Sequence, residues 1–451
     1  MIARATEFIV LFYFVVLISW AVLIYSDVPL EIAEILSVSG VFLFPYFTMA
    51  CVLIALIAEA HRIRLNYLQA AFISKQDYRL LELKMPATIE RSPEAMDIIL
   101  NRLNLTLNET NWSHTIWLGK VRPTWSFEII SAEGQIRMFI RIPNFHCHNV
   151  RTSIYSYYPE IQIEEVNDYV EEMTFNHKKD RMWGCMHKLK EKRALPLRTY
   201  LDYNIHSGKT SISIRAQRLG TETGDLVDPM APMIEAMGTL GVNEHMWVQF
   251  LIRAHKKNSI QKGFFGHYSH KKEVKEVLDG VKGKKKGSEE SKEDIGKFER
   301  ELVDNITRNA SKPQFDVGIR TLYFTKGEES FNATNIVELV SLLKSFKQPK
   351  YNFFSPMGGH TIGNYSWGPF VELIGLYPKG TVAQDMSKLL YRLYCDRTYF
   401  YPILSIPERY ISVMSSESLA TLIHPIGSHI STPTMPRVLS KKKQAPSNLP
   451  V

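Results

Sequence analysis

The stretch FIVLFYFVVLISWAVLIY, from Phe8 to Tyr25, and the stretch VSGVFLFPYFTMACVLIALIA, from Val38 to Ala58, are the two long apolar runs of this chain. Each has about the ~20 residues that a helix needs to cross ~30 Å of hydrocarbon. They predict a two-helix transmembrane hairpin over residues 1–60. A cleaved signal peptide is the alternative for the first run, but that run exceeds the usual apolar length of about 7–15 residues, and no small-residue cleavage site follows it.

Basic residues beside the runs predict the orientation of the hairpin. The loop between the runs contains acids and no Lys or Arg, whereas Arg62, Arg64, Lys75 and Arg79 follow the second run. Because Lys and Arg near the ends of spans stay on the cytoplasmic side, both termini are expected in the cytoplasm. The expected location is therefore the bacterial inner membrane, as a multi-pass protein.

The composition is typical of an anchored globular protein. Hydrophobic residues make up 45% of the chain and charged residues 22%, so the part after residue 60 has enough apolar side chains for a core. The formal charge of +8 indicates a modestly basic chain, which suits contact with anionic lipid headgroups or with nucleic acid. The 4 cysteines are too scattered for a disulfide framework and fit a reducing compartment.

Periodicity after the hairpin predicts an α+β fold of tandem ferredoxin-like domains. Residues 61–79 form an amphipathic connector, and residues 80–190 show the order β-α-β-β-α-β of a split βαβ unit. In this first domain, Ser92–Leu103 and Asn144–Tyr157 have helical spacing, and the turn Glu133-Gly134 joins two alternating strands.

The same order is expected again in a second domain, residues 191–357. Its strands are predicted at 198–205, 244–254, 315–324 and 351–354, and its helices at 229–240 and 332–346. Residues 255–312 form a Lys-rich insertion, read as a solvated loop with a short helix at 299–308. Residues 358–430 are an irregular α+β region, and residues 431–451 an extended tail rich in Pro and Lys.

The basic insertion holds the candidate contacts with nucleic acid or lipid. These residues are Lys271, Lys272, Lys275, Lys282, Lys284, Lys285 and Lys286. Few aromatic residues accompany them, so base stacking is not indicated. The lysines indicate at most nonspecific contact with phosphate.

Motifs for catalysis are incomplete. Gly208-Lys209-Thr210 lacks the earlier glycine of a phosphate-binding loop, and an alternating strand pattern follows it where a helix is required. Asp202 and His206 accompany no recognisable nucleophile, and His360 follows two glycines in a predicted loop. The acidic patch Glu164, Glu165, Asp168, Glu171 and Glu172 is expected to be a solvated face. We therefore expect no catalytic residues and no cofactor.

Metal-capable residues occur in two short stretches, His146-Cys147-His148 and Cys185-Met186-His187, with His177 nearby. The paired spacing of zinc sites is absent from both. In a helix, alternating donors point away from one another. No metal site is expected.

Distinctive short runs resemble those of a known group of proteins. They are Leu81 to Pro86, Tyr157 to Ile163, Leu419 to Pro425, Thr432-Pro433-Thr434 and Pro446 to Pro450. With these runs the chain resembles an uncharacterised membrane-protein family of small-genome candidate-phylum (Patescibacteria-type) bacteria. The resemblance implies a region that accompanies a motor ATPase of the conjugative coupling, HerA-like type, akin to type IV secretion components. No Walker loop is found in this sequence, so the resemblance implies a module without its own motor.

Three functional hypotheses follow. The first is a non-enzymatic inner-membrane subunit that docks a separate motor ATPase in a type IV secretion-like apparatus, in contact with the lipid bilayer and with possible homo-oligomers. The second is a membrane-bound, hydrolase-like enzyme that uses the loop around His360. The third is a membrane tether for nucleic acid through the basic insertion.

Overall fold

The structure is a computed structural model. It describes residues 30–86, 92–107, 112–173, 175–176, 179–203, 205, 228–255, 270–283, 297–327, 329–348, 351–357, 390–400 and 411–425.

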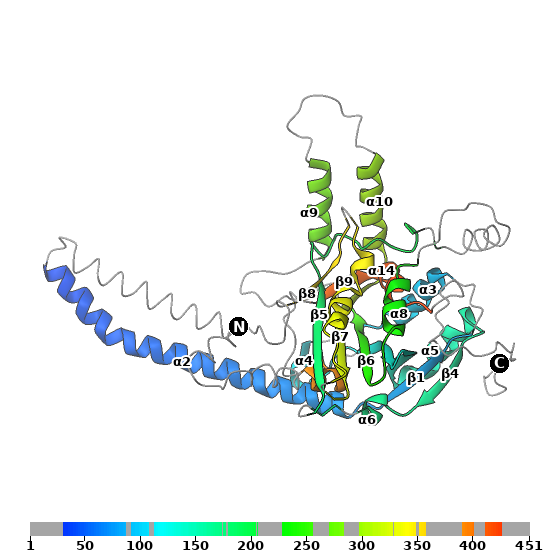
Figure 1. Cartoon of the computed structure of the whole chain (residues 1–451). Helices are drawn as coiled ribbons and strands as arrows, with labels where there is room; N and C mark the ends of the chain where they lie inside the picture. Colours follow the sequence, from blue (N-terminus) through cyan, green and yellow to red (C-terminus); the bar gives the residue numbers. More distant parts are fainter. Residues whose placement is uncertain are drawn as a thin grey trace.

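Helix α2 (Leu30–Ser74) is the first described element, and it is one continuous helix of 45 residues that ends at the body of the protein (Figure 1). The second apolar run and most of the predicted connector 61–79 thus belong to one helix. A search of the described residues finds no helix whose length and apolar character would suffice to cross a membrane.

This finding contradicts the predicted transmembrane hairpin and the predicted multi-pass location in the inner membrane. Within α2, the charged residues Glu59, Arg62 and Arg64 follow the second apolar run. The first run, from Phe8 to Tyr25, lies outside the described residues.

Nine strands form one antiparallel sheet in the order β4-β1-β3-β2-β6-β7-β5-β8, with β9 paired to β7. The strands are β1 (Tyr78–Lys84), β2 (Trp125–Ala132), β3 (Gln135–Pro143), β4 (Gln162–Val166), β5 (Arg181–Leu189), β6 (Glu244–Ala254), β7 (Gln314–Thr325), β8 (Phe354–Met357) and β9 (Ser412–Ser415). The helices besides α2 are α3 (Pro93–Leu103), α4 (Trp112–Trp117), α5 (Asn144–Tyr157), α6 (Tyr169–Glu172), α8 (Ala231–Gly238), α9 (His270–Gly283), α10 (Lys297–Ser311), α11 (Thr334–Ser341) and α14 (Ser416–Leu422), and η1 (Lys344–Phe346) is a 3-10 helix.

The predicted fold class, a membrane hairpin with tandem ferredoxin-like domains, is therefore wrong. Strands β2 and β6 pair along eight residues, from Trp125 opposite Ile252 to Ala132 opposite His245, and this pairing joins all the strands into one sheet. The physical reason is that β2 would otherwise leave a row of unpaired N–H and C=O groups at an open edge. Strand orders on the two sides of this junction, β4-β1-β3-β2 and β8-β5-β7-β6, mirror each other.

One face of the sheet packs against helices and forms the larger core, which crosses the junction. Buried side chains come from α3 (Ile99), α5 (Val150), α8 (Ile234), α11 (Leu339) and α14 (Leu419). Two of these helices, α3 and α5, begin within one residue of the predicted positions, because their apolar residues recur at helical spacing.

The opposite face has a smaller aromatic core, covered by α6 and by residues 390–400. Trp247 at its centre is fully buried and lies edge-on to Tyr169 and Phe324, with ring centroids 5.3 and 4.7 Å away. Tyr394 packs beside it, with its ring centroid 5.2 Å from that of Trp247. Residues 390–400 therefore act as a strap over the middle of the sheet.

Candidate functional site

A pair of helices, α9 and α10, projects from one end of the sheet (Figure 1). Val274 of α9 packs with Leu302 and Ile306 of α10 and with Ala194 of the body in a small apolar cluster. The predicted short helix at 299–308 is confirmed within α10, whereas α9 replaces part of the predicted solvated loop. We call α9 and α10 the arm.

The candidate Lys contacts lie on or beyond this arm. Lys275 is exposed on α9, and Lys271, Lys272 and Lys282 belong to the same helix. Lys284, Lys285 and Lys286 lie outside the described residues.

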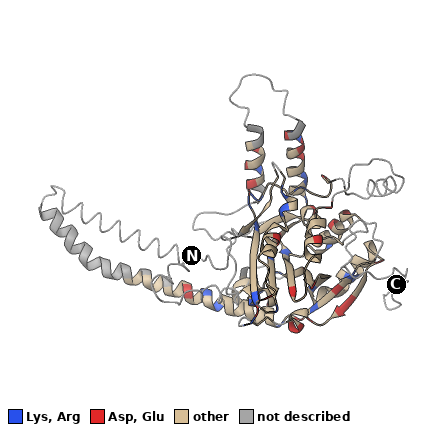
Figure 2. Cartoon of the chain, in the orientation of Figure 1, with Lys and Arg blue, Asp and Glu red and all other residues tan. Residues whose placement is uncertain are grey.

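Among the side chains of the arm that the structure describes, the exposed ones include more acids than bases (Figure 2). The exposed charged residues are Lys275, Glu276, Asp279, Arg300, Glu301 and Asp304. Binding to nucleic acid needs an excess of Lys and Arg, which the described side chains of the arm do not show. That hypothesis therefore depends on lysines outside the described part.

Buried ion pairs hold the base of the arm. Just beyond α10, Lys312 donates hydrogen bonds to Asp97 of α3, at 2.5 Å, and to Glu417 of α14, at 2.9 Å. Thr199 and Arg308 also donate to Glu417, at 2.6 and 3.0 Å. Burial of Glu417 opposes its ionisation, but the hydrogen bonds from Thr199 and Lys312 outweigh that effect and lower its pKa.

Two asparagines on α10 extend this network. Asn305 donates to the hydroxyl of Tyr351 at 2.7 Å, and the side-chain oxygen of Asn309 accepts from Ser415 and, at 3.1 Å, from Ser418. The polar residues of this network recur at spacings of three and four, so they lie on one face of α10 and its continuation. They are Asn305, Arg308, Asn309 and Lys312. The base of the arm is fixed to β9 and α14 by a polar face instead of an apolar one.

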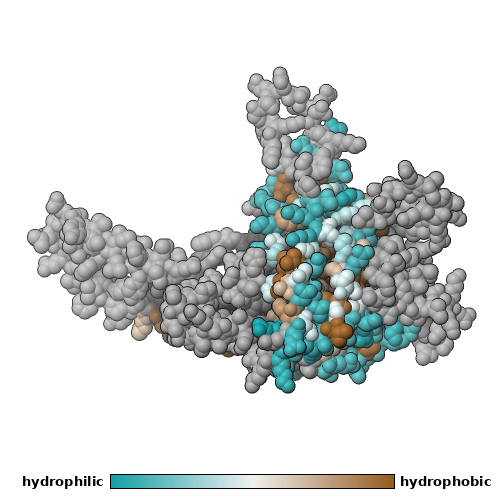
Figure 3. All heavy atoms as spheres, viewed as in Figure 1, coloured by the Kyte–Doolittle hydropathy of each residue, from teal (hydrophilic) through white to brown (hydrophobic). Residues whose placement is uncertain are grey.

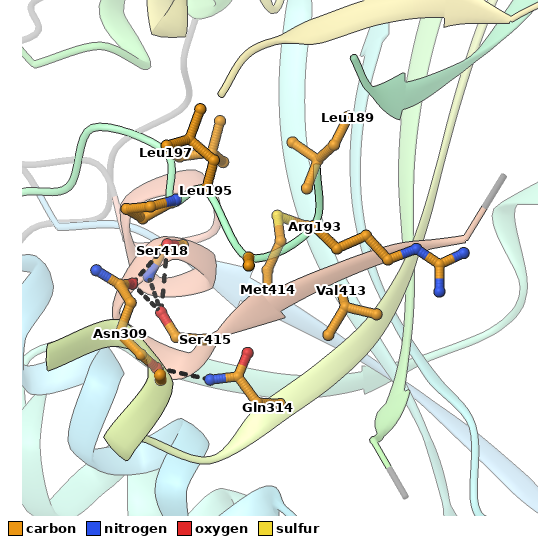
Figure 4. A pocket seen from close by; sticks show the side chains of 13 residues that line it. Leu189, Arg193, Leu195, Leu197, Asn309, Gln314, Val413, Met414, Ser415 and Ser418 are labelled. Atoms are coloured by element: carbon orange, nitrogen blue, oxygen red, sulfur yellow. Dashed lines mark hydrogen bonds between the residues drawn. The ribbon is translucent and has the colours of Figure 1, made fainter. Parts of the chain in front are cut away.

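A small pocket opens beside this base (Figure 4). Its lining includes Leu189, Arg193, Leu195, Asn309 and Met414. The volume of about 20 Å³ holds one or two water molecules, far below the roughly 300–1,000 Å³ of drug-sized ligand sites. This pocket is therefore part of the joint between arm and body and does not fit a substrate.

A second polar cluster lies under the strap, where the two halves of the sheet meet. Glu128 of β2 lies opposite Gln249 of β6, which lies opposite Arg320 of β7. All three are fully buried, and Arg320 donates to the carbonyl oxygens of Leu393 and Thr398 in the strap, at 2.6 and 2.7 Å. Glu128 and Gln249 each stand between two apolar residues of their strand, a signal of a buried polar row that the sequence analysis did not use.

Arg397 of the strap neutralises Glu128. Its guanidinium contacts Glu128 at 3.1 and 3.2 Å, and Tyr169 and Gln249 also donate to this carboxylate. Burial alone would raise the pKa of Glu128, but the positive charge of Arg397 outweighs it and lowers that pKa to about 2. The carboxylate of Glu128 is satisfied within the chain, and Glu128 has no proton to exchange near neutral pH.

Cys185, His187 and Thr321 form a third cluster. Because Cys185 and His187 lie two residues apart on strand β5, they point to the same face, and their side chains are 3.3 Å apart. Burial raises the pKa of the Cys185 thiol to about 12 and lowers the pKa of His187 to about 4. Both groups are therefore neutral near pH 7, which does not suit a thiolate nucleophile.

The other predicted motifs gather into no site within the described residues. His146, Cys147 and His148 lie on α5, and in the described part of the chain no group of three His, Cys, Asp or Glu side chains could hold a metal ion. The acidic patch is largely paired, since Glu164 contacts Lys84, Glu165 contacts Arg79 and Arg151, and Asp168 contacts Arg397. His177, His206, Gly208 to Thr210 and His360 lie outside the described residues.

The fold and the site together define a single-sheet α+β protein with a projecting helical arm. Comparison of the chain with protein-family models and with curated proteins finds no match. The resemblance to the candidate-phylum membrane-protein family therefore stays a prediction.

Proposed function

We propose that this chain is a non-enzymatic assembly subunit that holds a separate protein on its arm. One observation carries the proposal: the base of the arm is locked to the body by Glu417, Asp97 and Lys312, while the outer side chains of the arm contact solvent. Because the base of the arm is rigidly attached to the body, the arm meets its partner in one orientation and loses little conformational freedom on binding.

The polar contacts at the base of the arm support a role in positioning the arm relative to the body. Buried ion pairs add little net stability compared with apolar contacts, because each charge loses its hydration. They do require particular partners at particular distances, so they select one orientation of α10 relative to α14. An arm that served only to complete the core would be expected to use an apolar face.

Charge on the arm indicates the kind of surface that it meets. Among its described side chains, the exposed acids Glu276, Asp279, Glu301 and Asp304 outnumber the exposed bases Lys275 and Arg300, which favours a basic patch on the partner. The resemblance described above implies a motor ATPase of the conjugative coupling type as this partner. A translocation apparatus is the setting in which such a subunit would work.

Purification of the tagged full chain from its native cells, followed by identification of the associated proteins, tests this proposal. The variant Glu276→Lys/Asp279→Lys/Glu301→Lys reverses charge on the arm. A matched control, Glu171→Lys/Glu235→Lys/Glu338→Lys, makes the same change in net charge at exposed sites elsewhere. We expect an ATPase or secretion subunit with the wild type and the control, and its loss with the arm variant. Equal recovery with both variants, or no such protein with the wild type, would contradict the proposal.

A further inference from the structure

Helix α2 exposes an apolar seam along its described part. Apolar side chains recur with the alternating spacing 4-3-4-3-4, which is the a/d pattern of a coiled coil. The seam consists of Met49, Leu53, Leu56, Ala60, Ile63 and Tyr67, and the exposed fractions of its five large members are 65%, 58%, 62%, 61% and 71% in that order. Off the seam, Val52, Ile54 and Ile57 are also exposed, so the spacing and the flanking charges define the seam.

The body of the protein does not cover this seam. Where α2 reaches the body, Gln69 is buried, and the backbone of Leu68 lies so close to Gly119 that a Cβ there would be 2.5 Å away. Ile63 and Tyr67 stay exposed in the same part of the helix. Hydrophobic atoms on the described part of α2 are visible at the lower left of Figure 3.

Charges beside the seam are complementary for two parallel copies. With Leu53 and Ala60 at position a, Glu59 occupies position g and Arg64 occupies position e of the next heptad. In a parallel pair, position g of one helix lies beside position e of the following heptad in its partner. Two copies in register would therefore place each Glu59 next to the Arg64 of the other copy.

The single chain leaves this acid partly unsatisfied. Glu59 contacts Arg62 through one carboxylate oxygen, whereas Oε2 accepts no hydrogen bond from a residue that the structure describes. Arg64 makes only a long hydrogen bond of 3.4 Å to the carbonyl of Ile116 and lies over the ring of Trp117. Both charged groups have capacity for a further contact.

We propose that α2 pairs with α2 of a second copy of this chain as a parallel, in-register coiled coil through the seam. The seam spans 19 residues, or about 27 Å of helix at 1.5 Å per residue. Burial of an exposed Leu or Ile side chain contributes about 1.5–3 kcal/mol, so several such residues supply the driving force. The pairing is independent of the partner that binds the arm.

Light scattering of the full chain in a mild detergent, corrected for bound detergent, measures the number of copies. We expect two copies for the wild type and for His61→Asp, which changes an exposed residue off the seam, and one copy for Ile63→Asp. A wild-type particle with one copy, its seam covered by detergent alone, would overturn the proposal. So would two copies for Ile63→Asp.

Cysteine cross-linking tests the direction and the register, in a chain with Cys51→Ser and Cys395→Ser. In a parallel pair, position 60 faces position 60 of the other copy, so Ala60→Cys is expected to give a linked dimer on oxidation. Arg62→Cys, also exposed but off the seam, should give far less. Similar cross-linking at both positions would show that the copies meet at random, and would exclude pairing through the seam.

A charge swap tests the pairing between copies. Glu59→Arg and Arg64→Glu should each weaken the dimer roughly threefold, as measured by dilution, and the double swap should restore it. A double variant weaker than either single variant would contradict the parallel register.

Discussion

Arg397 and Glu128, separated by 269 residues in the sequence, form a buried ion pair between the strap and the central strands of the sheet. The same guanidinium also binds Asp168, at 2.5 and 2.8 Å. Arg397 has a φ of +51°, in the left-handed region that non-glycine residues seldom adopt. The contacts with two carboxylates explain why the chain accepts this backbone conformation.

Replacement of Arg397 by Met should destabilise the protein strongly. The change leaves Glu128 buried without its cation, and the loss of one partner of a buried pair costs about 3–5 kcal/mol. Urea unfolding followed by tryptophan fluorescence measures this loss, because Trp247 lies next to Tyr394 of the strap. Arg392→Met, an exposed change in the same segment, should stay within about 0.5 kcal/mol of the wild type. Equal stability of both variants would show that the pair does not hold the strap.

Acid should unfold the same region in a defined pH range. The pKa of Glu128 is lowered from 4.5 to about 2, so its ionised form stabilises the fold above pH 4.5. That contribution, on the order of 3 kcal/mol, is lost as the pH falls from about 4.5 towards 2. Unfolding free energies measured across this range should decrease less in Glu128→Gln than in the wild type. A parallel decrease in both would assign the acid sensitivity to other carboxylates.

Two glycines provide a matched test of packing under the strap. A Cβ at Gly318 of β7 would lie 2.5 Å from ring atoms of Tyr399, whereas a Cβ at Gly280 of α9 would meet no atom within 4 Å. Gly318→Ala should therefore destabilise the protein by about 1–3 kcal/mol, because the ring must move. Gly280→Ala should stabilise α9 by about 0.5–1 kcal/mol, since Ala is the better helix former. Thermal unfolding measures both effects. A shift of the unfolding temperature in the same direction for both variants would contradict this prediction.

His424 should make the protein less stable as the pH rises above neutrality. Burial lowers its pKa, but the carboxylate of Asp228, 3.0 Å away, outweighs burial and raises the pKa above 6.5. The charged form stabilises the fold fully below pH 6.5, and this stabilisation is lost as the pH rises through the raised pKa. Buried histidines with lowered pKa values, such as His187, act in the opposite sense and at lower pH.

Substitution of this histidine isolates the effect. His424→Gln should be less stable than the wild type at pH 6, by about 1–3 kcal/mol, and its stability should change less between pH 6.5 and 9. His148→Gln, an exposed change on α5, should keep the pH dependence of the wild type. If all three proteins showed the same slope in urea titrations, the pair of His424 and Asp228 would not be the cause.

Local sequence patterns predicted several of the regular elements. Helix α5 has the predicted bounds, and strand β6 also matches, because these segments have clear periodicity or strong β propensity. Strand β5 was missed: both of its faces are covered, so RMWGCMHKL does not alternate, and Gly184 weakens its strand character. A strand was predicted instead near Tyr200, where the structure has turns.

Long-range relationships could not be predicted from these patterns. The pairing of β2 with β6 depends on two edges separated by more than a hundred residues, and no local signal specifies it. The base of the arm similarly unites Asp97, Lys312 and Glu417 from three distant segments. The length of α2 was misjudged because the apolar run and the charged connector were treated as separate elements, although both favour helix.

Loss of Lys312 should loosen the arm without unfolding the sheet. Lys312→Met leaves Asp97 and Glu417 buried with fewer donors, which costs about 1–3 kcal/mol. Since α10 depends on this joint, its amide hydrogens should exchange roughly 10- to 100-fold faster, while those of β6 should change little. Lys275→Met, on the exposed side of α9, provides the control with the same loss of charge. Unchanged exchange in α10 would mean that the apolar cluster around Ile306, and not the buried ion pairs, fixes the arm to the body.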